Sequence, residues 1–173
     1  MLDKFIAAVA AVSRLCGLVA AAFIFVAVLV ICQMVFVRYA LNYATIWQTE
    51  FVTYSLIAAT FIGCPYVLLH RGHVNVDLLP LHLGPRGRYW LALVAALTSL
   101  AFTLLLAILG CAWWEEAWSK GWASDSIWRV RLWIPYSAMP IGMALLSLQY
   151  LAEILGLLTG RAAPFGIAAE DRR

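Results

Sequence analysis

The chain has 173 residues, of which 65% are hydrophobic and only 12% are charged, and its formal net charge is +3. Soluble domains are about 45–50% apolar and about 25% charged, so this composition excludes a water-soluble globule and predicts an all-α integral membrane protein. The length allows four or five spans of about 20 residues without a soluble domain, and the small, dispersed charge excludes a nucleic-acid-binding surface.

Four apolar segments predict four transmembrane helices, which pair as two helical hairpins in a single membrane domain of residues 1–173. The predicted spans are residues 15–37, 47–69, 89–114 and 135–158. Before the first span, Leu2, Phe5, Ile6 and Val9 share one helical face, which predicts a short N-terminal interfacial helix. Pro140 is expected to bend the fourth helix.

The apolar run near the N-terminus is short and is followed by Ser13 and Arg14, so we expect no cleaved signal peptide. The four cysteines lie inside or at the ends of apolar segments and form no C-x-x-C pair: Cys16, Cys32, Cys64 and Cys111. We interpret them as small packing residues. Their positions argue against a quinone-dependent, disulfide-forming membrane protein, which needs paired cysteines in its loops.

Basic residues divide eight to four between the two sides of the predicted bundle. The N-terminus, the loop between the second and third spans and the C-terminus hold the eight, so the positive-inside rule predicts that both termini are cytoplasmic. Six tryptophans surround the last loop on the opposite side, as in an aromatic belt at headgroup level.

Glu50 is the ionisable residue most in need of explanation, because a carboxylate one turn inside a span is costly unless it is paired or near water. The first interpretation is an interfacial ion pair with Arg38, at the end of the first span. The alternative is a proton or cation site. We favour the pair, since Glu50 lies near the headgroups and no second acid joins it in the span.

The second span carries a stripe of polar and aromatic side chains at helical spacing, which should face protein rather than lipid. Its members are Glu50, Thr53, Tyr54, Ile57, Thr60 and Phe61. The stripe could contact another subunit or pack within this chain's own bundle. In the fourth span, Gln149 and Glu153 lie one turn apart and predict a polar contact with a neighbouring helix.

The loop after the second span contains His70, His73 and Asp77, which with His82 could supply nitrogen and oxygen ligands. Arg71 between the histidines would repel a cation, and the spacing matches no metal motif, so we expect no metal site. All three histidines fall in one loop, which excludes haem ligation within the bilayer. The sequence also contains no nucleophile elbow, zincin motif, P-loop or dinucleotide fingerprint, so it predicts neither an enzyme nor a bound cofactor.

Several motifs together resemble the small membrane subunit of tripartite ATP-independent periplasmic (TRAP) transporters. They are Arg38-Tyr39, Trp47 with Glu50, Gly63, the string from His70 to Asp77, Ile134-Pro135-Tyr136 and Pro140-Ile141-Gly142. The resemblance covers nearly the whole chain. The family often has two adjacent acids after the tryptophan, whereas this chain has Thr49 before Glu50.

The resemblance implies a subunit of the bacterial or archaeal inner membrane that supports a larger multi-span subunit, which holds the substrate and sodium sites. A periplasmic substrate-binding protein would deliver an organic acid. From the motifs and the helical stripe together, the candidates for partner contacts or structural roles are Arg38, Trp47, Glu50, Thr53, Tyr54, Thr60, His73, Asp77 and Pro140. Two alternatives stay open: an independent small proton-coupled transporter that uses Glu50, and a tetraspan assembly subunit of another membrane complex.

Overall fold

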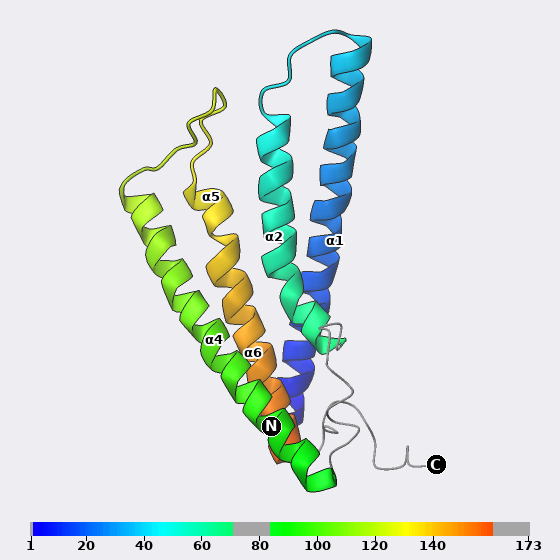
Figure 1. Cartoon of the computed structure of the whole chain (residues 1–173), viewed down its shortest axis with the longest axis vertical. Coiled ribbons are helices and arrows are strands. Elements are labelled where there is room, and N and C mark those ends of the chain that lie inside the picture. Colours follow the sequence, from blue (N-terminus) through cyan, green and yellow to red (C-terminus); the bar gives the residue numbers. More distant parts are fainter. Residues whose placement is uncertain (1, 71–83, 161–173) are drawn as a thin grey trace.

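The computed structural model describes residues 2–70 and 84–160, and most of them are helical. The helices are α1 (Leu2–Ala40), α2 (Gln48–Leu69), α4 (Pro85–Ser119), α5 (Trp133–Tyr136) and α6 (Ala138–Leu158) (Figure 1). The described residues include four helical segments that are long and apolar enough to cross a membrane, with α5 and α6 forming one of them. The predicted all-α membrane fold is confirmed.

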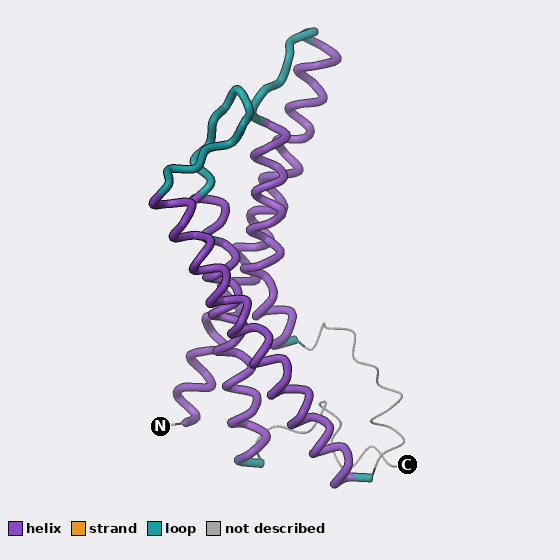
Figure 2. The backbone as a smooth tube through the Cα atoms, turned by 60° about the vertical axis from the view of Figure 1, so that its left-hand side comes forward, coloured by secondary structure: helices purple, strands orange, loops and turns teal. Residues whose placement is uncertain are grey.

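The helices form two antiparallel hairpins, α1 with α2 and α4 with α6, and α2 packs against α6 between them. Both connecting loops, residues 41–47 and 120–132, lie at the same end of the bundle (Figure 2). We call the half that contains these loops the loop half and the half where α1 begins and α6 ends the terminal half. Toward the loop half, the two hairpins lean apart (Figure 1).

The terminal half contains the apolar core. Leu68 of α2, Ala107 of α4, and Met143 and Leu146 of α6 are buried together there. At Gly142 the α6 backbone lies directly on α2, since a Cβ at that position would overlap the carbonyl oxygen of Phe61. Small residues of this kind let membrane helices approach closely, and van der Waals packing then holds them together.

Two buried polar contacts tie α6 to its neighbours. The hydroxyl of Ser13 in α1 donates to Oε1 of Gln149 over 2.7 Å, and only 1% of Ser13 and 5% of Gln149 are exposed. The hydroxyl oxygens of Ser147 and Thr103 in α4 lie 3.0 Å apart. Gln149 therefore makes the predicted contact with a neighbouring helix.

The separate N-terminal interfacial helix predicted from the sequence is not formed. One continuous helix of 39 residues, about 58 Å long, runs from Leu2 to Ala40. The first half of this helix contains no proline, and its single glycine, Gly17, is accommodated against the ring of Tyr66. Because Ser13 is also held against Gln149, the chain continues along α6 instead of turning onto the membrane surface.

The predicted fourth helix is interrupted at Ser137, between α5 and α6. Pro140 has no N–H to donate to the carbonyl of Tyr136, and its ring crowds that carbonyl. The hydroxyl of Ser137 instead donates to the carbonyl of Ile134 over 2.7 Å, which supports the local turn. Pro65 lies inside α2, where the axis of that helix changes direction near its end (Figure 1).

Candidate functional site

The first turn of α2 presents its carboxylate to the other hairpin. Trp47 is the residue that precedes the helix, and Glu50 is its third residue, where a negative charge is favoured by the helix dipole. Oε1 of Glu50 accepts a hydrogen bond from the hydroxyl of Ser124 over 2.8 Å. The second oxygen, Oε2, is buried and has no hydrogen-bond partner within residues 2–70 and 84–160.

The predicted ion pair between Arg38 and Glu50 is wrong. Arg38 lies at the end of α1, and its Nε donates to Oγ1 of Thr45 over 2.7 Å. The loop after α1 turns back at Asn42, which adopts a φ of 56°. This turn lets Arg38 bond to Thr45 of the same loop. Glu50 instead bonds to Ser124 of the opposite hairpin, so Arg38 and Glu50 have different hydrogen-bond partners.

The loop of residues 120–132 folds as a short hairpin. An isolated antiparallel bridge joins Ala123 to Arg131, and the N–H of Ser124 donates to the carbonyl of Val130 over 2.8 Å. Inside this turn, the N–H of Ser126 donates to Oγ of Ser124, and the N–H of Trp128 donates to Oγ of Ser126, both over 3.2 Å. Two loop serines thus fix the position of Trp128.

The ring of Trp128 packs against that of Trp47, with 6.0 Å between the ring centroids. No role for the two loop serines was predicted from the sequence. The sequence Ser124-Asp125-Ser126 could have predicted a turn here, because serine and aspartate side chains bond to nearby backbone groups in turns. That signal predicts a turn but does not identify the distant carboxylate that the turn contacts.

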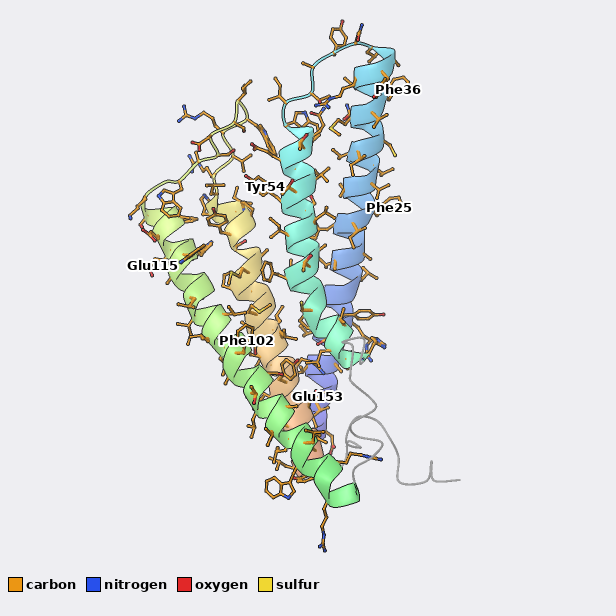
Figure 3. All side chains as sticks on the ribbon, in the orientation of Figure 1. Phe25, Phe36, Tyr54, Phe102, Glu115 and Glu153 are labelled. Carbon is orange, nitrogen blue, oxygen red and sulfur yellow. The ribbon has the colours of Figure 1, made fainter. Side chains whose placement is uncertain are left out.

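The polar stripe of α2 divides between two environments. Thr53 and Thr60 are exposed, and their hydroxyls donate to the carbonyls of Thr49 and Leu56 in their own helix over 2.9 and 2.8 Å. These bonds satisfy both hydroxyl donors within α2. Tyr54 is half-buried on the side of α2 that faces α5 (Figure 3).

An apolar cavity of about 210 Å³ lies between the hairpins in the loop half. Tyr54, which follows Glu50 by one helical turn, forms part of the cavity wall. Side chains from four helices line the cavity: Tyr54, Ile57, Phe61, Gly110, Trp113, Pro135, Tyr136 and Met139. Apart from the two phenol hydroxyls and the indole N–H of Trp113, the lining side chains are apolar, so the cavity suits a hydrocarbon or aromatic group better than a charged one.

Tryptophans gather around the loop half of the second hairpin. The rings of Trp118 and Trp133 are 4.5 Å apart in an edge-to-face arrangement, and those of Trp114 and Trp118 are 5.7 Å apart. Trp113 is 64% exposed and Trp118 is 55% exposed. The position of these rings at headgroup level stays a prediction.

The two candidate residues His73 and Asp77 lie outside the described residues. His70, the residue after α2, packs against Tyr66 in a tilted arrangement, with ring centroids 4.4 Å apart. Among the residues that the structure describes, no group of three or more His, Cys, Asp or Glu side chains is placed to hold a metal ion. The four cysteines are free thiols; Cys16 is buried, whereas Cys32 and Cys111 are exposed.

The helices of membrane length, the interhelical polar contacts and the apolar cavity define a polytopic membrane protein. The family model for the DctQ component of tripartite ATP-independent periplasmic transporters matches residues 27–160, and the chain belongs to this family. The chain is also similar to the C4-dicarboxylate TRAP transporter small permease protein DctQ of Vibrio cholerae serotype O1, with 30% identity over 149 residues. That alignment covers 73% of this chain and 64% of the relative. The family consists of transporter subunits, a role that is not enzymatic.

Proposed function

We propose that this chain is the small scaffold subunit of a sodium-coupled TRAP transporter that takes up an organic acid. The observation that carries the proposal is the family match over residues 27–160, which extends from the second half of α1 past the end of α6. The relative from Vibrio cholerae is named for C4-dicarboxylates, so a dicarboxylate of that size is the first substrate to test.

The proposed partners are a large multi-span membrane subunit, which would hold the substrate and sodium sites, and a periplasmic substrate-binding protein. The lining of the cavity supports a substrate site in the large subunit rather than in this chain, because the lining side chains offer a carboxylate no cationic partner. Glu50 is already bonded to Ser124, which favours a structural role over proton coupling.

Reconstitution tests this assignment. Proteoliposomes that contain this chain, the large subunit and the binding protein should accumulate succinate when a sodium gradient is applied. Vesicles with this chain alone should not. Gradient-driven uptake by the chain alone would overturn the scaffold assignment and favour an independent transporter, for which Glu50→Gln should abolish uptake.

We further propose one four-helix domain in the inner membrane, with both termini in the cytoplasm. The start of α1, the end of α2, the start of α4 and the end of α6 lie at the same end of the bundle (Figure 1). By sequence, eight of the twelve Lys and Arg residues belong to the N-terminus, the connection between α2 and α4 and the C-terminus, and the positive-inside rule assigns these segments to the cytoplasm. Topology reporters at the C-terminus and near Gly84 should report cytoplasm, and one near Ala123 should report periplasm. A periplasmic C-terminus would contradict this orientation.

The proposed contact with the large subunit is the exposed face of α2 formed by Thr53, Ile57 and Thr60. The outer face of α1 carries bulky apolar side chains such as Phe25 and Phe36, which point away from α2 and suit lipid (Figure 3). The face of α2 is smoother, because its threonine hydroxyls are bonded to their own helix. Threonine-rich faces of this kind favour close helix contacts in membranes.

A bulky substitution on this face should separate the two subunits. Thr60→Trp should reduce copurification of the large subunit while leaving expression of this chain unchanged. Thr98→Trp is the matched control, because Thr98 is also exposed and also donates to the carbonyl four residues before it, but it lies on α4. Equal copurification with both variants would remove α2 from the proposed interface.

A further inference from the structure

The two hairpins are held together differently along their length. In the terminal half, buried side chains of α2, α4 and α6 form a shared core. In the loop half, α1 has no buried residue after Ala27, and an apolar cavity lies among α2, α4 and α5. The hairpins meet again beyond the cavity, where the loop of residues 120–132 reaches the first turn of α2.

The contact at that point is a closed circuit of five residues, joined through side chains and two backbone N–H groups. Glu50 accepts from Ser124, whose hydroxyl oxygen accepts from the N–H of Ser126; Ser126 in turn accepts from the N–H of Trp128. Trp128 packs on Trp47, which precedes Glu50 by less than one turn. Trp47 and Trp128 are each 39% exposed, so the circuit lies near the surface rather than in the core.

We propose that this circuit, which we call the strap, is a conformational device that sets the angle between the two hairpins. One carboxylate on α2 and one hydroxyl in the opposite loop form its polar link, and the two indole rings form its apolar link. The backbone contact between Gly142 and Phe61 lies deeper in the bundle and supplies the pivot. When the strap is released, the hairpins separate in the loop half while the terminal core stays packed.

The strap also controls the cavity. Tyr54 follows Glu50 by one helical turn, so the polar link lies directly above one cavity wall. The opposite wall is formed by Trp113, Pro135 and Tyr136 of the second hairpin. Because the two walls belong to different hairpins, a change in the angle between the hairpins widens or closes the cavity.

The natural cysteines allow a direct measurement of this angle. Cys32 lies on α1 and Cys111 on α4, and both are exposed. We would replace Cys16 and Cys64 by alanine, attach spin labels to the two exposed thiols and reconstitute the full chain in nanodiscs. Double electron–electron resonance then gives the distribution of distances between the two hairpins.

Glu50→Leu and Ser124→Ala should each shift this distribution to longer distances and broaden it, because either change removes the polar link. Glu50→Gln should leave the distribution unchanged, since an amide oxygen still accepts from Ser124. Glu115→Leu is the matched control, because it removes an exposed carboxylate of α4 from the same half of the bundle.

The outcomes separate the possibilities. A shift in both disrupting variants, with none in Glu50→Gln or Glu115→Leu, supports the strap. An unchanged distribution in Ser124→Ala overturns it, and so does a shift in Glu50→Gln as large as that in Glu50→Leu. Ser124→Ala removes a single loop hydroxyl, so the test stays decisive if Glu50→Leu does not fold. The measurement uses this chain alone and does not depend on the transporter assignment.

Discussion

The terminal half and the loop half of the bundle are made from the same helices but differ in how closely those helices pack. In the terminal half, small residues such as Ala107 let the helices touch, as Gly142 does at its boundary with the loop half, and buried hydroxyl and amide groups join the helices. In the loop half, the larger side chains of Tyr54, Trp113 and Tyr136 surround a cavity. Side-chain size along one helix can therefore determine where a membrane bundle packs rigidly and where its helices can shift relative to one another.

The largest expected effect comes from adding a methyl group at Gly142, where α6 is in direct contact with α2. Gly142→Ala places a Cβ against the backbone of Phe61, which cannot rotate away, so we expect a loss of about 3 kcal/mol in the free energy of unfolding. Unfolding in mixed detergent micelles, followed by circular dichroism, measures this change. Gly84→Ala is the control, because nothing lies within 4 Å of its added Cβ. Equal stability of the two variants would show that the terminal half is not the rigid part.

A smaller effect is expected from the buried contact between α1 and α6. Gln149→Leu leaves the hydroxyl of Ser13 buried without its acceptor, which should cost about 1–2 kcal/mol in the same unfolding assay. The double variant with Ser13→Ala should recover part of that loss, because no hydroxyl is then left unpaired. Additive losses in the double variant would contradict the contact.

The smallest expected effect concerns the contact between α4 and α6. Thr103→Val keeps the shape of the side chain but removes its hydroxyl, and Ser147 retains a 2.8 Å bond to the carbonyl of Met143. We therefore expect a loss of only about 0.6 kcal/mol in the unfolding assay. A loss as large as that of Gln149→Leu would mean that this contact contributes as much to the terminal half as the contact at Ser13.

The fold class and the two hairpins could be predicted from the sequence, because runs of apolar residues of membrane length have few other solutions. The contact of Gln149 with a neighbouring helix could be predicted for a similar reason, since an amide inside a span must find a partner. The direct approach of Gly142 to Phe61 was not predicted, because a glycine in a sequence does not reveal which backbone lies opposite it.

The partners of the charged side chains were harder to predict. Arg38 and Glu50 are close in sequence and opposite in charge, which suggested a pair, but each found a hydroxyl instead. Ser124 follows Glu50 by 74 positions, and no local pattern links a serine in a turn to a carboxylate at that distance. The break at Ser137 was easier to anticipate, because the missing N–H of Pro140 acts within its own helix.

The unequal lengths of α1 and α2 create a hydrophobic mismatch inside a single hairpin. With 22 residues, α2 is about 33 Å long, close to the roughly 30 Å hydrocarbon thickness of a bilayer. Gln33 meets Gln48 at one end of the pair, and Gly17 lies against Tyr66 near the other. The part of α1 before Ser13 therefore projects beyond the end of α2. In a bilayer whose thickness matches α2, that first part of α1, with Asp3 and Lys4, would extend as a continuous helix into the headgroup region.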